Sequence, residues 1–490
     1  MREMVEGDKV EHDEYGIGVV EGLLGGIIRV NFFGELIDVR RDELKVRGPS
    51  EPLPVEVGAG PQAPDLERAA FRRSFEAINL GIIPPDPSQL IKFTMGAESI
   101  TKQIINWLES YRIDGLCKAV FGYYGSGKSH LLNLVKCVAL ELGWVVSYVE
   151  FDPKEADPAK PHLVYRNLMA NLEFPPRHDG SKTEGFFDFI KEIRDSWYSK
   201  SIKSLELFKD SPWFSTAIEI LIHYPHSEDQ SYQAACNWLA GDYKSYDQIN
   251  SLGREKGYRR KAPRMPVTKE TGEIYVHHLS VIGHLCAALG YKGLMIILDE
   301  AEHVRGYNVR RRERANNFFD LLALCSHRPL EGASPYLNEH GFNLPPYWLH
   351  GPHFGLFVGL TEGDTFADPD TSVRDACVFA HDLDDCIFIK PPLPEHYGVW
   401  CQRFFLEFHR HYPSQTKLLA NKGTVQAISE SLAEMFGKVP IDTAVLRNWT
   451  KIAGLVLCIL LSRKVVNASS LMKEVEQVAG QYLGFMPWEE

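Results

Sequence analysis

The chain has 490 residues, enough for two to four domains, and its 44% hydrophobic and 24% charged residues are typical of a globular protein. Its net charge of −12 excludes a global basic field, so any binding to nucleic acid must use local patches. Nine scattered cysteines without a C-x-x-C pair, no apolar leader and no run long enough to cross a bilayer predict a cytoplasmic protein without zinc cluster, disulfide framework or membrane contact.

Residues 5–47 predict a small all-β module. Short alternating apolar segments are separated by turn residues such as Gly25-Gly26. The pattern G-D-K-V-x-H-x-x-Y-G-x-G-x-V resembles the SH3/Tudor-like barrels of bacterial helicase tails and transcription-coupling factors, and this resemblance implies a docking surface for a protein or for nucleic acid. We therefore expect an SH3-like β-barrel over residues 1–47, either as a docking module or as a cap without a partner.

Residues 48–64 are rich in proline and glycine and predict a linker. Apolar residues on one face predict a helix from Asp65, which the prolines of residues 84–87 interrupt, and a further helix over residues 100–108. We expect an α/β domain over residues 65–392 to begin here.

The segment Cys117–Leu142 carries the strongest motif. A short apolar run precedes GYYGSGKS, which fits the phosphate-loop pattern G-x-x-x-x-G-K-[ST], and an amphipathic helix follows. Lys128 is expected to reach the phosphates of a nucleoside triphosphate, and Ser129 to ligate Mg²⁺. A flexible glycine turn is the alternative. The residues expected to hold ATP are Gly122, Tyr123, Tyr124, Gly125, Ser126, Gly127, Lys128, Ser129 and His130.

A second acidic motif ends the apolar run Leu294–Leu298. Asp299 and Glu300 follow that run directly, as in the Walker B segment of NTPases that activate water with a glutamate. We expect this strand to lie beside the phosphate-loop strand, with Asp299 facing Mg²⁺ and Glu300 orienting the attacking water.

Two further residues are candidate phosphate sensors. The apolar strand over residues 355–362 places Thr361 at its tip, where NTPases of this class carry a polar sensor of the γ-phosphate. After a fifth strand at residues 386–390, residues 393–490 predict a helical lid, the AAA+ arrangement. Arg447 lies on the third lid helix, at the place of a second-sensor arginine; a solvated arginine on a helix is the alternative.

Two basic segments are candidate contacts for phosphate. A helical insertion over about residues 175–290 contains the segment Arg254 to Arg264, with six basic residues in eleven, which either grips the DNA backbone or forms a solvated loop. Past the Asp-Glu pair, arginines either act on a neighbour's γ-phosphate, bind DNA or form a solvated helix face. They are Arg305, Arg310, Arg311, Arg312 and Arg314.

Several segments together resemble the BrxD-type ATP-binding proteins of BREX phage-defence systems, which are similar to the origin-recognition branch of AAA+ ATPases. The resemblance covers roughly residues 66–450, and the segments that carry it are RRSFEAINLGIIP, FGYYGSGKSHLL, YVEFD, LVYRNLMANL and GYKGLMIILDEAE. The resemblance implies an ATPase that works beside a large helicase in prokaryotic antiviral defence and binds DNA. Two departures are the N-terminal barrel and Asp442-Thr443-Ala444 in place of a Pro-Arg pair, which leaves the second-sensor role to Arg447.

The expected function is therefore a P-loop AAA+ ATPase that hydrolyses ATP with Mg²⁺, acts on DNA with a helicase partner and forms a nucleotide-dependent homo-oligomer. The alternative is a regulatory switch or assembly scaffold that holds ATP with negligible turnover and docks a transcription or repair protein through its N-terminal barrel. A nucleotide kinase is a third reading, but no acceptor-binding motif is found.

Overall fold

The computed structural model describes residues 9–12, 16–24, 27–32, 35–40, 44–47, 65–114, 116–176, 183–197, 212–223, 230–242, 245–255, 272–326, 336–337, 343–344, 353–361, 386–390, 392–438, 446–462 and 467–483. Their contacts divide the chain into two units, Met1–Gln62 and Ala63–Glu490.

The first unit is a five-stranded antiparallel sheet in the order β4-β3-β2-β1-β5. Its strands are β1 (Lys9–His12), β2 (Gly16–Leu24), β3 (Ile27–Phe32), β4 (Glu35–Arg40) and β5 (Leu44–Arg47). Three apolar side chains of this sheet are buried: Val20, Ile28 and Val39. The expected β structure is present, whereas closure into an SH3-like barrel stays a prediction, and Tyr15 and the Gly25-Gly26 turn lie outside the described residues.

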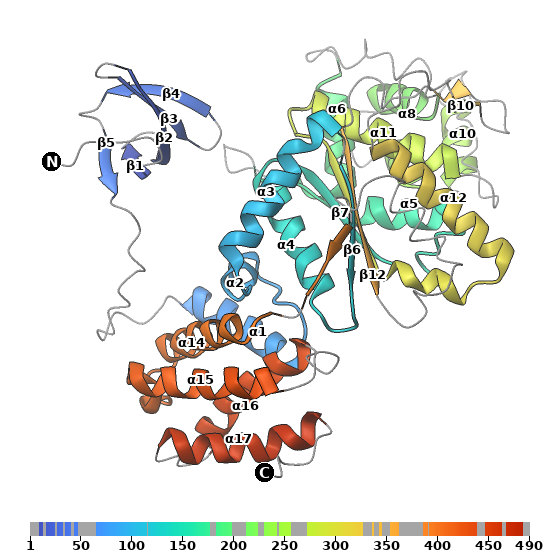
Figure 1. Cartoon of the computed structure of the whole chain (residues 1–490). Helices are drawn as coiled ribbons and strands as arrows, with labels where there is room; N and C mark the ends of the chain where they lie inside the picture. Colours follow the sequence, from blue (N-terminus) through green and yellow to red (C-terminus); the bar gives the residue numbers. More distant parts are fainter. Residues whose placement is uncertain are drawn as a thin grey trace. The chain divides into compact units, whose positions relative to one another are not determined.

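The second unit is built on a six-stranded sheet in the order β13-β6-β12-β9-β7-β8, in which only β8 runs antiparallel to its neighbour (Figure 1). The strands are β6 (Cys117–Gly122), β7 (Val145–Glu150), β8 (Leu172–Glu173), β9 (Leu294–Asp299), β12 (Phe354–Thr361) and β13 (Cys386–Phe388). This mostly parallel sheet confirms the expected α/β class.

The expected order of the strands was wrong in one respect. The acidic strand β9 does not lie beside the phosphate-loop strand β6, because β12 pairs in parallel with both. Every β12 residue before Thr361 is buried, which suits the central position of a sheet that is covered on both faces. Apolar runs predict that a strand is buried, but they do not specify its neighbours.

Helices cover both faces of this sheet, and alternate residues of each strand belong to different cores. One face packs against α3 (Ala97–Asp114) and α4 (Lys128–Glu141). The other packs against α5 (Pro161–Ala170), α11 (Gly272–Ala288) and α12 (Val309–Ser326), as Figure 1 shows. The two layers hold the carboxyl ends of the parallel strands along one edge.

The expected helical insertion extends the second of these cores. Its described helices are α6 (Gly185–Asp195), α8 (Pro212–His223), α9 (Gln230–Leu239) and α10 (Ser245–Glu255). Buried side chains from α6, α8 and α9 join the core between the sheet and α11. A short two-stranded ladder, β10 (Tyr336–Leu337) with β11 (Asn343–Leu344), lies later in the chain.

A separate helical bundle is formed by the segment expected to be the lid, whose role stays a prediction, and this bundle also contains α1, a helix that precedes the first strand of the sheet. Phe71 of α1 (Asp65–Leu80) is fully buried in the lid core and its ring stacks on His411, with the centroids 4.2 Å apart. The other elements of the bundle core are α14 (Pro394–His411), η7 (Lys417–Ala420), α15 (Lys422–Lys438), α16 (Leu446–Ser462) and α17 (Ala468–Leu483). The short helix α2 (Pro87–Lys92) contacts this bundle through an ion pair between Lys92 and Glu407 of α14. The lid is thus assembled from both ends of the second unit.

Candidate nucleotide-binding site

The loop between β6 and α4 has the backbone shape that its glycines allow. Gly125 and Gly127 have φ of 75° and 106°, in the left-handed region that side chains disfavour, and Gly127 caps the start of α4. A Cβ on Gly122 would lie 2.5 Å from Ser126 Oγ. The loop therefore turns tightly between strand and helix, and the unpaired N–H groups of the first helical turn face it.

Lys128, the first residue of α4, reaches back to the end of β6. Its Nζ donates to the carbonyl oxygens of Gly122 at 3.1 Å and Tyr123 at 3.4 Å, and the residue is 7% exposed. Burial lowers the pKa of this ammonium, and the carboxylates of Glu302, Asp299 and Glu300 oppose that drop. Lys128 and the acidic motif, far apart in the chain, are therefore electrostatic neighbours.

Asp299 is a fully buried carboxylate at the end of β9. Tyr148 of β7 donates its hydroxyl to Oδ2 at 2.7 Å, and the Glu300 N–H donates to Oδ1 at 2.9 Å. A Cβ on Gly359 of β12 would lie 2.5 Å from Oδ1, so glycine at this position leaves room for the carboxylate. The sheet thus fixes the orientation of Asp299 from three strands.

Glu300 has an unusual backbone conformation. Its φ of 60° is the one positive φ on a non-glycine residue in the described part of the chain. Residues held in this region cost about 1–3 kcal/mol and occur preferentially at functional sites. Burial raises the pKa of the Glu300 carboxyl group, and the negative charges of Glu302 and Asp299 raise it further. Its Oε2 lies 3.6 Å from His303 Nε2.

Thr361 lies at the same edge as these groups. It is the last residue of β12 and the register partner of Gly122 in β6. Its hydroxyl donates a hydrogen bond to Oε1 of Glu302, which follows Glu300 in the short helix η3 (Ala301–Gly306). The expected sensor is therefore placed one strand from the phosphate loop.

Arg447 of α16 contacts the phosphate loop directly. Its backbone N–H donates to the Gly125 carbonyl at 3.2 Å, and Nη1 donates to the Tyr124 hydroxyl at 2.7 Å. The guanidinium carbon also lies 4.8 Å from the centroid of the Tyr124 ring. The lid arginine predicted from the sequence is therefore next to the loop, although it comes from the far end of the chain.

The remaining two residues of the motif differ in environment. Ser129 follows Lys128 in the first turn of α4, and its magnesium role stays a prediction. His130 is half-buried, and its Nε2 lies 2.8 Å from Thr94 Oγ1, so its ring contacts the segment after α2. Burial lowers the pKa of His130 to about 4.

The sequence did not single out Tyr148 and Glu302 as members of this site. Tyr148 belongs to the YVEFD segment and Glu302 to the DEAE segment, both of which carry the family resemblance. Their contacts join residues 151 and 59 positions apart in the chain. A sequence signal existed for Glu302, since a third acidic residue closely follows Asp299, but none distinguished Tyr148 from a core tyrosine.

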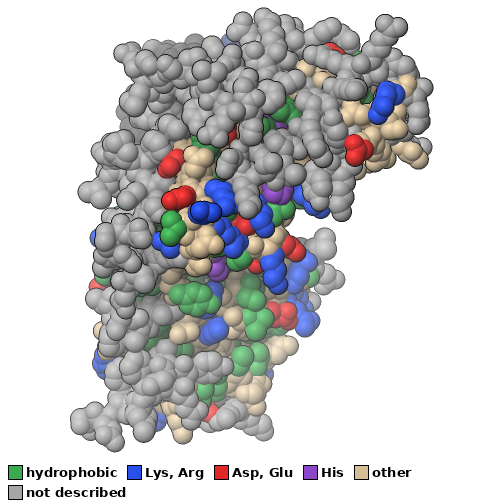
Figure 2. Space-filling view, turned by 90° about the vertical axis from the view of Figure 1, so that its right-hand side faces the viewer, with side chains coloured by type: hydrophobic (Ala, Val, Ile, Leu, Met, Phe, Trp, Pro, Cys, Tyr) green, Lys and Arg blue, Asp and Glu red, His purple; other side chains and the backbone are tan. Residues whose placement is uncertain are grey.

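The structure describes the two candidate DNA-binding segments to different extents. Of the segment Arg254 to Arg264, only the first two residues are described; Arg254 is exposed at the end of α10. On α12, Arg311 is tied to its own chain, because it bonds to Asp157 Oδ2 at 2.9 Å and its guanidinium lies 3.6 Å from the centroid of the Tyr307 ring. Figure 2 shows Lys and Arg side chains gathered near the middle of one face, with Asp and Glu side chains among them.

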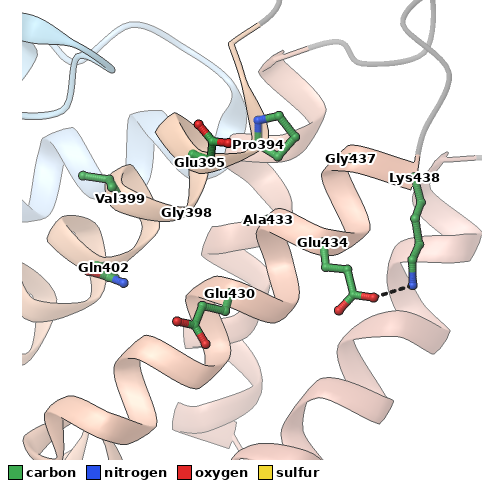
Figure 3. A pocket seen from close by; sticks show the side chains of 10 residues that line it. All are labelled: Pro394, Glu395, Gly398, Val399, Gln402, Glu430, Ala433, Glu434, Gly437 and Lys438. Carbon is green, nitrogen blue, oxygen red and sulfur yellow. Dashed lines mark ion pairs between the residues drawn. The ribbon is translucent and has the colours of Figure 1, made fainter.

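A groove of about 500 Å³ lies elsewhere, between α14 and α15 of the lid (Figure 3). Val399 and Gln402 line it from α14, and Ala433 and Glu434 from α15, where Glu434 pairs with Lys438 at 2.7 Å. None of the phosphate-loop or acidic-motif residues lines this groove, so it is separate from the candidate site.

Within the described residues, none of the helices combines the length and apolar composition that a bilayer crossing requires.

Comparison with known proteins gives a family match. The model of the family described as "BREX system ATP-binding protein BrxC/D" matches residues 67–337, which is more than half of the chain. Among solved structures, the chain is similar to the Walker-type ATPase PABY2304 of Pyrococcus abyssi, with 13% identity, 79% of this chain and 76% of that chain covered, and a TM-score of 0.25. No curated protein matches the chain.

Proposed function

The chain belongs to the BREX system ATP-binding protein BrxC/D family, and from this premise we propose that it binds ATP with Mg²⁺ at the β6–α4 loop and hydrolyses it. One observation carries the proposal: Lys128, the adjacent pair Asp299 and Glu300, and Thr361, from three separate segments, meet at one edge of the sheet. A structural role alone gives no reason to gather three carboxylates around one buried lysine.

The donor set suits a hard divalent cation. Asp299 and Ser129 offer a carboxylate and a hydroxyl oxygen, which are ligands that Mg²⁺ prefers. Each Asp299 oxygen accepts one hydrogen bond and keeps a further lone pair for a cation. Bound Mg²⁺ would neutralise charge on the phosphates, while Tyr148 keeps the ligand oriented, as outer hydrogen bonds do at metal sites.

We assign the hydrolytic step to Glu300. Its carboxylate accepts a proton from, or orients, the water that attacks the γ-phosphate, and its raised pKa moves it toward the range of an effective base. Lys128 stabilises charge on the transferred phosphoryl group, and Thr361 contacts the γ-phosphate. Arg447 couples nucleotide binding at the phosphate loop to the position of the lid. The strained backbone at Glu300 favours this assignment over a switch without turnover.

The wider role follows from the family. We propose that the protein acts in prokaryotic antiviral defence beside a helicase partner, binds DNA through the segment Arg254 to Arg264, and assembles with nucleotide. Residues 65–392 are the proposed ATPase domain and 393–490 the proposed lid, with α1 added to the lid by its packing. ATP turnover would move the lid against the sheet, and the N-terminal sheet would dock a partner.

The decisive experiment compares steady-state ATP hydrolysis of the wild type with Glu300→Gln and Lys128→Ala, with and without duplex DNA. We expect Glu300→Gln to lose at least about 100-fold in kcat, the usual contribution of a positioned base, while still binding ATP in calorimetry. Lys128→Ala should lose binding itself.

The matched control is Glu155→Gln, which changes an exposed carboxylate outside the site and should leave turnover unchanged. Turnover that survives Glu300→Gln would overturn the assignment of the base, and wild-type protein that binds ATP without hydrolysing it under any of these conditions would favour the switch.

A further inference from the structure

The Glu302 carboxylate occupies a position that the proposed catalytic roles do not explain. Its Oε1 accepts the hydrogen bond from Thr361, and its Oε2 is buried without a hydrogen-bond partner among the described residues. A buried carboxylate oxygen without a donor is costly, because charged groups lose more than neutral ones when they leave water. Such a group usually has a cationic neighbour.

That neighbour is Lys128. Thr361 lies directly across from Gly122 in the parallel β12–β6 ladder, and the Gly122 carbonyl accepts from Lys128 Nζ at 3.1 Å. The carboxylate bound to Thr361 and the ammonium bound to Gly122 therefore lie at the ends of adjacent strands, which are about 4.8 Å apart in a sheet. Of the three carboxylates that oppose the drop in the Lys128 pKa, Glu302 acts most strongly.

The hydrogen-bond count at Thr361 sets up a competition. A threonine hydroxyl has a single proton, and here that proton is donated to Glu302. A γ-phosphate oxygen that contacts Thr361 must accept this hydrogen bond in place of Glu302. It must also compete with Glu302 for the positive charge of Lys128. A nucleoside diphosphate has no γ-phosphate and makes no such demand on Thr361.

We propose that Glu302 is an internal competitor of the γ-phosphate, which lowers the affinity for ATP relative to ADP and releases Thr361 only when a triphosphate binds. The inference rests on the function proposed above. It makes Glu302 a positioning residue that sets the preference between di- and triphosphate, because its carboxylate repels the phosphate that would replace it and acts through Thr361 and Lys128.

The test measures the affinities for ATP and ADP with Mg²⁺ by isothermal titration calorimetry, in a Glu300→Gln background that prevents hydrolysis. Glu302→Gln keeps the size of the side chain and removes its charge. We expect ATP to bind about 10-fold more tightly in this variant and ADP to change less than about 3-fold, so that the ratio of the two dissociation constants shifts by several-fold. Glu155→Gln in the same background is the control for charge alone.

A double-mutant cycle with Thr361→Val separates this role from a structural one. If Glu302 acts through Thr361, the gain in ATP affinity from Glu302→Gln becomes smaller once the hydroxyl is absent. Equal changes for ATP and ADP, or weaker ATP binding in Glu302→Gln, would overturn the inference and leave the proposed function intact. Failure of the Glu300→Gln parent to bind either nucleotide would instead overturn the proposed function, and the inference with it.

Discussion

At the residue scale, the orientation of Asp299 depends on a tyrosine from a neighbouring strand. Tyr148→Phe removes the donor to Oδ2 without changing the packing of the ring, so the carboxylate loses one of its two fixed contacts. We expect the Mg²⁺ concentration for half-maximal ATP hydrolysis to rise about 10-fold, the lower end of the effect of outer partners at metal sites. A magnesium titration of steady-state activity measures it.

Tyr165→Phe is the matched control for this substitution. Tyr165 is fully buried, whereas Tyr148 is half-buried, and its hydroxyl also donates one hydrogen bond, at 2.8 Å, but to the Leu239 carbonyl rather than to Asp299. Both variants should lose some stability, about 1 kcal/mol for one hydrogen bond. An equal magnesium shift in both would mean that Tyr148 acts only through stability.

The half-buried His130 predicts how stability changes with acidity. His130 has a pKa of about 4 in the folded protein because burial disfavours the charged ring, against about 6.5 in the unfolded chain. Between pH 6.5 and pH 4 the unfolded chain binds a proton at this ring and the folded protein does not. The free energy of unfolding is therefore unaffected by this histidine above pH 6.5 and decreases as the pH falls toward 4. At pH 5 the loss is about 2 kcal/mol.

His130→Gln should therefore reduce the difference between the denaturation midpoints measured at pH 7.5 and pH 5. Burial also lowers the pKa of His277 to about 3, so part of the loss of stability at low pH remains in this variant. His396→Gln, on an exposed position of α14, is the comparison that keeps every buried histidine. An unchanged pH dependence in His130→Gln would show that the ring is not the titrating group.

The residues of the site were predictable to the extent that they form local patterns. Lys128 is recognisable because the glycine spacing and the helix that follows it lie within one short segment, and Asp299 and Glu300 follow an apolar strand directly. The contacts of Glu302 with Thr361 and of Tyr148 with Asp299 depend on how separate segments fold together, which composition and periodicity do not encode.

At the scale of elements, the turn after α1 places the lid arginine. Gly81 ends α1 with φ of 70°, and its N–H donates to the Ile78 carbonyl at 2.9 Å. A Cβ at this position would lie 2.6 Å from Arg447 Cγ and 2.7 Å from Lys451 Cε. We expect Gly81→Ala to displace Arg447 from Tyr124 and to lower ATP turnover several-fold, measured in a steady-state assay.

Gly96→Ala is the matched control, because Gly96 has nearly the same φ of 65° but no atom within 4 Å of the added methyl. Both substitutions should cost about 1–2 kcal/mol of stability from the left-handed backbone. If both lose turnover equally, strain rather than the contact with Arg447 is responsible.

The elements themselves were more predictable than their arrangement. Apolar runs and helical periods indicated β6, β7, β9 and β12 and the lid helices, because burial on one or both faces leaves a regular pattern. The insertion of β12 between β6 and β9 was not predicted, and neither was the place of α1 in the lid. Both depend on packing between elements whose sequences do not specify which other element they contact.

At the scale of the whole molecule, the net charge of −12 requires that any DNA contact be local. We expect neutralisation of Arg259, Arg260 and Lys261, which lie outside the described residues, to reduce the slope of log affinity against log salt by about 3 on duplex DNA. Fluorescence anisotropy with a labelled duplex over a salt series measures this slope.

The comparison variant replaces Arg310, Arg312 and Arg314 of α12 by glutamine and removes the same charge. A slope that changes only in this second variant would assign the DNA contact to α12, and a slope that changes in neither would remove DNA from the proposed function.

The packing of α1 has a mechanical consequence for the rest of the chain. The tether of residues 48–64 is attached to α1, and α1 is anchored in the same aromatic core as α14 and α16 rather than in the sheet domain. Any rotation of that bundle therefore moves α1, the helix at which residues 48–64 join the second unit. Under the proposed function, movement of the bundle would act on the attachment point of the N-terminal strands directly, without a change in the sheet domain.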